Sequence, residues 1–283
     1  IRLSLVGSEM CIRDSNMTLV GTPTLFIDGE WCASSDGGRR PTYNPYDASV
    51  IMHVDEATSN DARRAIAAAK AFFSSSDWSR RSYQDRCELL NRMADSLQKN
   101  KAELARIETI DTGKTLGESE IDIDDVTNVF RFYAKEALKL AEDKRVTGPL
   151  VPESVKSLVV HEPVGVCVLI TPWNYPILQL CWKLAPALAT GNVVIVKPSE
   201  VTPLSTIYLV HMMLEVGFPS GSIQLLTASG ASIGSVLTES PDVDLVSFTG
   251  GLQTGRSIIR SCAETVKRCT CLLYTSDAAD EGL

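Results

Sequence analysis

The chain has 283 residues, of which 44% are hydrophobic and 22% charged, the composition of an ordinary globular protein. Its 35 acidic and 27 basic residues give a net charge of −8, which argues against a nucleic-acid-binding protein and its usual basic surface. No apolar stretch approaches a membrane span, and the eight cysteines form neither CxxC pairs nor zinc-ligand spacings, so we predict a reduced cytoplasmic protein without a metal site.

The first half of the chain predicts a hairpin and a short strand followed by helices. Thr24–Trp31 alternates apolar and polar residues around Asp28-Gly29, a pair typical of a hairpin turn. Thr58 and Asn60 are candidate caps of the first helix, and Gly113 is expected to end the third. The other expected elements are a strand at Val50–Val54 and helices over Arg63–Phe73, Ser82–Leu97, Lys101–Thr112 and Asp122–Glu142.

The second half predicts strands that alternate with helices. The expected strands are Val164–Thr171, Asn192–Lys197, Ile223–Leu226 and Leu245–Phe248, the first two continuous apolar runs typical of buried parallel strands. The expected helices are Tyr175–Ala189, Leu204–Val216, Ile233–Thr238 and a last one that begins at Thr254. This alternation indicates an α/β fold with a wound parallel sheet, in which ligands bind beyond the carboxyl ends of the strands.

The turns after these strands carry the candidate chemistry, and each has two interpretations on spacing alone. Asn174, just past the first strand, is placed to stabilise an oxyanion, although the spacing by itself favours a simple helix cap. Lys197 and Glu200 fit a pair that holds ribose hydroxyls, and equally a surface turn capped by Ser199. The glycines of 248–256 fit a phosphate-binding turn or a plain loop. Neither GxGxxG nor GxxxxGK[ST] is present.

Taken together, the three turns are more specific. ITPWNYP, then KPSE, then FTG with a further glycine five residues on, in this order, resemble the NAD-dependent aldehyde dehydrogenases. The resemblance extends over about residues 25–270 and corresponds to the first half of a family member. IETIDTGKT and the IDIDDV stretch at 121–126 are most similar to the betaine-aldehyde and aminoaldehyde dehydrogenases. The resemblance to this family implies a Rossmann-like sheet flanked by helices, with an oligomerisation hairpin at residues 142–163.

The resemblance also assigns roles to individual residues. Asn174 matches the oxyanion-hole asparagine, and Glu200 matches a ribose ligand whose carboxylate would repel a 2′-phosphate, which favours NAD over NADP. The implied cofactor-binding residues are Thr171, Pro172, Trp173, Lys197, Ser199, Glu200, Gly230, Gly234, Phe248, Thr249, Gly250, Gly251 and Gly255. Tyr175 and Trp182 match aromatic positions of the substrate tunnel, where rings can hold a cationic group; core packing is the alternative.

Three departures separate this chain from the family pattern. Gly251 stands where a serine usually meets the pyrophosphate, and Ala228 replaces the first glycine of a TGxG turn. The E-L-G-G-K segment with the general base and the G-Q-x-C segment with the nucleophilic cysteine are absent, so the catalytic domain is missing. We therefore expect no aldehyde oxidation by this chain. A complete protein is expected to convert an aldehyde to its acid through a cysteine thioester, as a homodimer or homotetramer. A non-catalytic nucleotide-binding or scaffold module is the alternative.

We expect residues 1–15 and about 271–283 not to belong to the native protein. Met10–Asp14 and the start of the next codon can be encoded by ATGTGTATAAGAGACAG, whose reverse complement encodes Cys271–Thr275 in another frame. Unrelated segments rarely share such an inverted repeat, and both resemble translated sequencing adapters. Genomic DNA continuous across either junction would contradict this hypothesis. The NAD-binding domain is then expected to comprise residues 16–141 and 164–270.

Overall fold

A seven-stranded sheet forms the centre of the computed structural model, which describes residues 22–141, 144–145 and 158–273. The strand order is β11-β10-β7-β8-β9-β1-β2, in which the first five strands are parallel and β1 and β2 are antiparallel at one edge. The strands span Leu25–Ile27 (β1), Glu30–Cys32 (β2), Val166–Ile170 (β7), Val193–Lys197 (β8), Ile223–Leu225 (β9), Leu245–Gly250 (β10) and Arg268–Leu273 (β11). The predicted α/β fold with a parallel sheet is confirmed.

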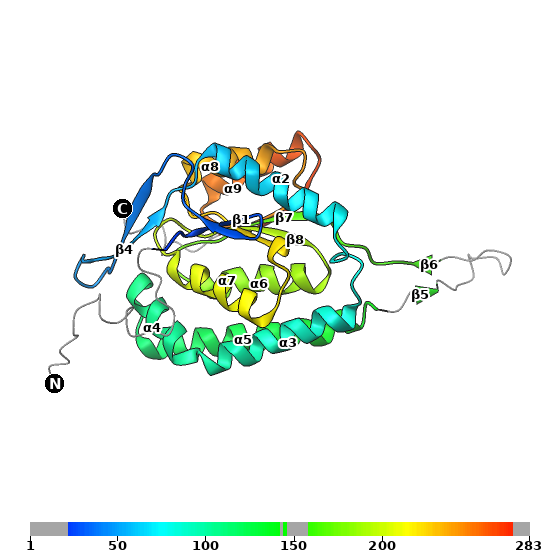
Figure 1. Cartoon of the computed structure of the whole chain (residues 1–283), viewed down its shortest axis with the longest axis horizontal. Helices are drawn as coiled ribbons and strands as arrows, with labels where there is room; N and C mark the ends of the chain where they lie inside the picture. Colours follow the sequence, from blue (N-terminus) through cyan, green and yellow to red (C-terminus); the bar gives the residue numbers. More distant parts are fainter. Residues whose placement is uncertain (1–21, 142–143, 146–157, 274–283) are drawn as a thin grey trace.

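Helices cover both faces of this sheet (Figure 1). On one face lie α2 (Ser59–Ser75), α8 (Gly230–Glu239) and α9 (Leu252–Ala263). On the other, α6 (Pro176–Ala189) and α7 (Leu204–Val216) pack against the sheet, and α3 (Tyr83–Lys99), α4 (Lys101–Thr112) and α5 (Leu116–Leu138) form a further layer. Every residue of β7 and β8 is buried, as their continuous apolar sequences require. None of the helices described is long and apolar enough to cross a membrane.

The helix boundaries follow local capping chemistry. Thr58 accepts a hydrogen bond from the backbone of Asp61 and forms a complete capping box, so Thr58 is confirmed as the cap and α2 begins at Ser59, four residues before the predicted helical spacing. Gly113, in the left-handed conformation with φ +80°, ends α4 as expected. By contrast, α5 begins six residues before the predicted start, because Thr115 and Glu118 form a second capping box that the apolar spacing alone does not reveal.

Two strands were not expected from the sequence. β3 (Arg39–Tyr43) pairs with β4 (Val50–Asp55) in a separate antiparallel sheet, although β3 is short and contains a proline. β11 pairs in parallel with β10 from Arg268 to Leu273, although the sequence from Cys271 onward has neither a helix nor a strand period. The free edge of β10 offers backbone partners to this segment, and such pairing does not need a strongly alternating sequence.

The predicted hairpin at 142–163 is described only in part. β5 (Lys144–Arg145) pairs antiparallel with β6 (Leu158–Val159), and the two strands extend away from the layered body (Figure 1). The remainder of the hairpin loop, 146–157, lies outside the described residues, as do residues 1–15 and 274–283 of the predicted non-native ends. The oligomerisation role of the hairpin and the origin of the two ends therefore stay predictions.

Candidate functional site

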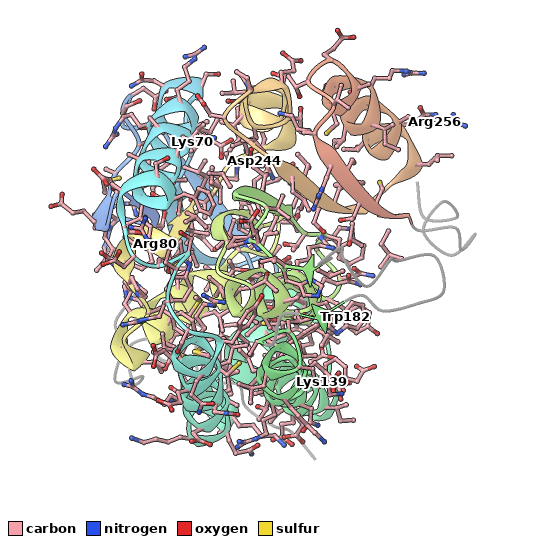
Figure 2. The ribbon with its side chains drawn as sticks, turned by 90° about the vertical axis from the view of Figure 1, so that its right-hand side faces the viewer. Lys70, Arg80, Lys139, Trp182, Asp244 and Arg256 are labelled. Carbon is pink, nitrogen blue, oxygen red and sulfur yellow. The ribbon has the colours of Figure 1, made fainter. Side chains whose placement is uncertain are left out.

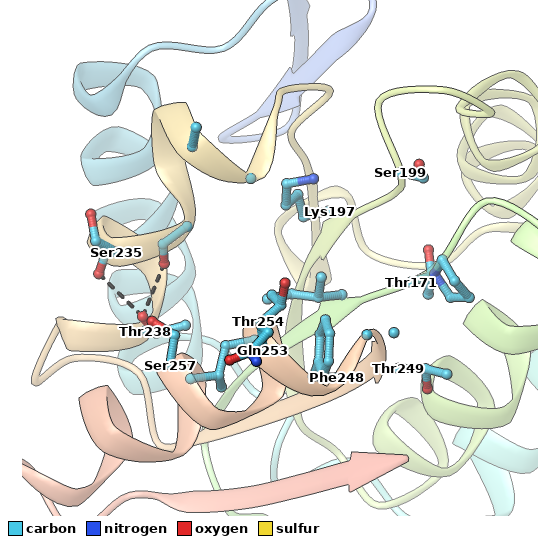
Figure 3. Close-up of a pocket in the computed structure, with 18 of the residues that line it drawn as sticks. Thr171, Lys197, Ser199, Ser235, Thr238, Phe248, Thr249, Gln253, Thr254 and Ser257 are labelled. Atoms are coloured by element: carbon cyan, nitrogen blue, oxygen red, sulfur yellow. Dashed lines mark hydrogen bonds between the residues drawn. The ribbon is translucent and has the colours of Figure 1, made fainter. Parts of the chain in front are cut away.

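A cleft of about 1220 Å³ lies at the carboxyl ends of β7, β8 and β10, where the sheet meets the N-termini of α8 and α9 (Figure 3). Three turns far apart in the sequence meet there because parallel strands end at the same edge of the sheet. All but one of the predicted cofactor residues line it: Thr171, Pro172, Trp173, Lys197, Ser199, Glu200, Gly230, Gly234, Phe248, Thr249, Gly250 and Gly251. The exception, Gly255, is buried in the first turn of α9, where its amide donates to the Gly251 carbonyl at 3.1 Å.

Lys197 and Glu200 form the charged part of the cleft. The Lys197 ammonium is almost fully buried, donates to the Pro198 carbonyl at 3.0 Å and lies 3.6 Å from Glu200 Oε2. Burial lowers the pKa of Lys197, and the Glu200 carboxylate opposes this shift. The Glu200 side chain is 36% exposed and keeps one side toward solvent. A ligand with neighbouring hydroxyls can accept from the ammonium and donate to the carboxylate.

The N-terminus of α9 is open to an anion. Its cap residue is Gly251, no side chain caps its first amides, and no acidic residue lies in its first turn. A helix end of this kind presents backbone N–H donors and a partial positive charge. A Cβ built on Gly230, Gly234 or Gly251 would meet no atom within 4 Å, so these positions leave room in the cleft. The residues present therefore fit a phosphate-containing ligand.

The residues at the far end of the cleft were not predicted from the sequence. Ser235 and Thr238 of α8 and Ser257 and Ser261 of α9 also line it, and Figure 3 labels the first three of these. Thr238 Oγ1 donates to the Gly234 carbonyl at 3.0 Å. The signal that could have revealed them is the spacing of three and four residues between hydroxyls, which places each pair on one helix face.

Asn174, Tyr175 and Trp182 lie outside the lining of this cleft. The turn that carries Asn174 is anchored by Thr202 Oγ1, which donates to the Trp173 carbonyl at 3.0 Å, and Asn174 itself is half-buried. Tyr175 is the N-cap residue of α6 and is 42% exposed, while Trp182 is 44% exposed further along this helix. Neither ring is core packing. One face of Tyr175 is already used, because the Lys114 ammonium lies 3.8 Å from the ring centroid.

Behind Tyr175, Lys114 is held by buried carboxylates. Its ammonium contacts Asp122 of α5 and lies 3.8 Å from Glu108 of α4. Burial raises the pKa of Glu108 to about 7, against the lowering influence of Ser205 and Lys114. Burial likewise raises the pKa of Asp111, whose Oδ2 accepts the Leu204 amide at 2.8 Å and so caps α7. This cluster joins α4, α5 and α7 to the turn before α6.

Glu108→Gln is expected to flatten the pH dependence of stability. With its pKa raised from 4.5 to about 7 in the folded chain, Glu108 contributes stability that is fully present below pH 4.5 and lost as the pH rises through 7. At pH 8 the free energy of unfolding is lower by about 3 kcal/mol than it is below pH 4.5, from the pKa difference of Glu108 alone. The variant should therefore match wild type near pH 5 and exceed it at pH 8.

Urea denaturation at several pH values between 5 and 8 measures this difference. His211, whose pKa burial lowers to about 4, acts in the opposite direction but is present in both proteins and cancels. Glu88→Gln, at an exposed carboxylate of α3, is the control and should run parallel to wild type. A constant offset between Glu108→Gln and wild type at every pH would refute a titrating Glu108.

The family of the chain follows from its similarity to known proteins. The model of the aldehyde dehydrogenase family matches residues 31–279, which is most of the chain. The chain belongs to the aldehyde dehydrogenase family. The family resemblance inferred from the three turns is thus confirmed, and the cleft lies in the part of the fold that the family shares.

Relatives of the chain agree with the predicted branch of the family. The chain is 44% identical over 245 residues to betaine aldehyde dehydrogenase of Bacillus subtilis, covering 87% of this chain and 49% of the relative. It is 41% identical over 251 residues to the peroxisomal aminoaldehyde dehydrogenase 2 of Pisum sativum, covering 88% and 50%. The crystal structure of Staphylococcus aureus betaine aldehyde dehydrogenase in complex with NAD+ superposes with a TM-score of 0.87 at 42% identity, covering 94% and 51%. The chain thus spans about half the length of these relatives.

Proposed function

We propose that the chain is the NAD-binding half of an aldehyde dehydrogenase. The observation that carries the proposal is the meeting of the ITPWNYP, KPSE and FTG turns in one cleft that ends on the uncapped N-terminus of α9. The complex of the S. aureus relative with NAD+ supports the choice of cofactor. Lys197 and Glu200 hold the ribose hydroxyls, and the amides of α9 bind the pyrophosphate. NAD, when bound, supplies the hydride acceptor.

In the complete protein, Asn174 donates a hydrogen bond to the oxyanion that forms when a cysteine attacks the aldehyde. The half-buried position of Asn174, directly after β7 and before α6, supports this role. The nucleophile and the general base belong to segments that this sequence does not contain. We therefore expect this chain to bind NAD and to oxidise no aldehyde.

The substrate class proposed is betaine aldehyde or an aminoaldehyde, the substrates after which the B. subtilis and pea relatives are named. Tyr175 and Trp182 are both exposed enough to contact a ligand. Because Lys114 covers one face of Tyr175, only the opposite face of this ring is available to a cationic substrate group. Assembly of the complete protein into a homodimer or homotetramer through residues 142–163 and a cytoplasmic localisation remain part of the proposal.

Glu200→Gln tests the cofactor assignment. Loss of the carboxylate removes a charged acceptor from the ribose hydroxyls, so NAD affinity should fall about tenfold and discrimination against NADP should weaken. Isothermal titration calorimetry of the 283-residue chain with each dinucleotide measures both effects. Glu239→Gln removes a carboxylate from the other end of the same cleft and should leave NAD binding unchanged. Unchanged NAD affinity in Glu200→Gln would rule out the ribose role.

Gly251→Ser is expected to strengthen NAD binding. The family usually has serine at this position, and the Gly251 backbone, with φ −68°, accepts a side chain without strain. A hydroxyl there adds one hydrogen bond to the pyrophosphate, an affinity gain of about fivefold. Gly251→Ala adds the same Cβ without the hydroxyl and serves as the control in the same titration. An equal effect of alanine and serine would contradict the hydrogen bond.

A further inference from the structure

Two turns of the cleft come from neighbouring strands of the sheet. Residues 171–175, here called the oxyanion turn, follow β7 and include Asn174. Residues 197–200, the ribose turn, begin at the last residue of β8 and include the proposed ribose ligands. Figure 3 labels Thr171 on the oxyanion turn and Lys197 on the ribose turn. The Thr171 amide donates to the Lys197 carbonyl at 3.2 Å, so the two turns start in contact.

Beyond Thr171, the oxyanion turn has little support of its own. Pro172 within it and Pro176 directly after it lack a backbone amide donor. Tyr175, the N-cap residue of α6, makes no side-chain capping hydrogen bond, and Thr171 Oγ1 is buried without a partner among the described residues. Trp173 is 58% exposed. The conformation of this turn therefore depends on contacts from other segments.

Thr202 provides such a contact. It is 1% exposed, and its Oγ1 donates to the Trp173 carbonyl at 3.0 Å. The Trp173 carbonyl and the Asn174 amide belong to the same planar peptide group, so a hydrogen bond that holds the carbonyl also fixes the plane from which Asn174 extends. Thr202 thus acts, through the backbone, on the residue proposed to stabilise the oxyanion.

Thr202 is also connected to the ribose turn. It lies two residues after that turn ends, and the amide of the intervening Val201 donates to Ser199 Oγ at 3.2 Å. Beyond Thr202, the Leu204 amide donates to Asp111 Oδ2 at 2.8 Å, which anchors the start of α7. A ligand that holds the ribose turn therefore restricts a short segment that is already fixed at its other end, and Thr202 lies in this segment.

We propose that Thr202 is a positioning residue that couples the two turns, so that a ligand bound to the ribose turn also orders Asn174. The inference rests on the proposed function, because it takes the ribose turn as part of the dinucleotide site. When the ribose hydroxyls are bound, the segment that carries Thr202 loses freedom, and its hydrogen bond holds the peptide group between Trp173 and Asn174 in one orientation. Cofactor binding then prepares the oxyanion site before an aldehyde arrives.

Hydrogen exchange with ADP as the probe tests this coupling. ADP carries the adenosine ribose and the diphosphate but lacks the nicotinamide. In the 283-residue chain at saturating ADP, exchange of the amides of residues 173–175 and 199–202 should slow at least about fivefold, the contribution of one hydrogen bond. Slowing at 199–202 without slowing at 173–175 would overturn the proposal. No slowing at either turn would refute the ribose assignment of the proposed function, and the coupling with it.

Two substitutions separate the Thr202 hydroxyl from the rest of the side chain. Thr202→Ser keeps the donor and should behave as wild type. Thr202→Val has the same shape without the donor, and ADP should still protect residues 199–202 but no longer 173–175. Thr127→Val is the matched control, because Thr127 Oγ1 is also buried and donates to the Ile123 carbonyl at 2.9 Å in α5, away from the cleft lining. It should leave the protection of both turns unchanged. Equal protection of residues 173–175 in the valine and serine variants of Thr202 would indicate direct contact with ADP and would overturn the proposal.

Discussion

Gly234→Leu will reduce NAD binding by at least about a hundredfold and leave the fold intact. Gly234 lies on the side of α8 that lines the cleft, and a Cβ there meets no atom within 4 Å, so the leucine side chain occupies cleft space instead of displacing protein. The leucine side chain then occupies space between α8 and α9 that a dinucleotide needs. Because it is branched, it cannot move aside without colliding with α9. Replacing a helical glycine should itself raise stability by up to about 1 kcal/mol.

Gly117→Leu is the matched control. Gly117 is also a helical glycine, in the first turn of α5, and a Cβ there likewise meets no atom within 4 Å, but it does not line the cleft. Both variants should unfold at the same or a higher urea concentration than wild type, and only Gly234→Leu should lose the calorimetric signal of NAD binding. Retained NAD affinity in Gly234→Leu would place the cofactor elsewhere. This would count against the cleft, whereas the family membership would stand.

The turns after the strands were predictable because their chemistry is local. Lys197 and Glu200 are three residues apart, and Gly250 ends a strand directly before the helix cap Gly251, so the sequence brings each pair together without tertiary information. That the turns after β7, β8 and β10 share one cleft followed from the parallel order of the strands. The tunnel role of Trp182 stays a prediction of the family resemblance, whereas its 44% exposure rules out the alternative of core packing, which the spacing alone allowed.

The parts that the sequence did not reveal depend on distant contacts. The hydroxyl groups of α8 and α9 come together only because the two helices line the same cleft. The sequence predicts no special role for Lys114, which follows a helix. In the structure, its ammonium lies over the Tyr175 ring and close to carboxylates of α4 and α5. Such properties follow from packing, which a periodicity does not encode.

Gly165→Ala will destabilise the fold by about 3 to 5 kcal/mol, the sum of backbone strain and a broken buried hydrogen bond. Gly165 precedes β7 with φ +132°, a conformation that side chains rarely adopt, and a Cβ there would lie 2.0 Å from Asp244 Oδ2. That oxygen accepts the Val166 amide at 2.8 Å, and the Val166 carbonyl accepts the Asp244 amide at 2.9 Å, so the contact joins the starts of β7 and β10. Lys70 of α2 lies 3.9 Å from the same carboxylate, and both side chains are labelled in Figure 2.

Gly37→Ala separates the two causes. Gly37 also has a positive φ, +74°, but a Cβ there meets no atom within 4 Å, so alanine at this exposed site adds strain without a collision and should cost about 1 kcal/mol. A double-mutant cycle isolates the collision itself. If the methyl group added in Gly165→Ala displaces the Asp244 carboxylate, this collision is absent in the Asp244→Ala background. Gly165→Ala should then lower the free energy of unfolding of that background by little more than Gly37→Ala lowers that of wild type. An equal loss of stability in the Asp244→Ala background and in wild type would assign the whole effect to backbone strain at Gly165. The contact between the starts of β7 and β10 would then depend on the conformation of Gly165 and not on the Asp244 carboxylate.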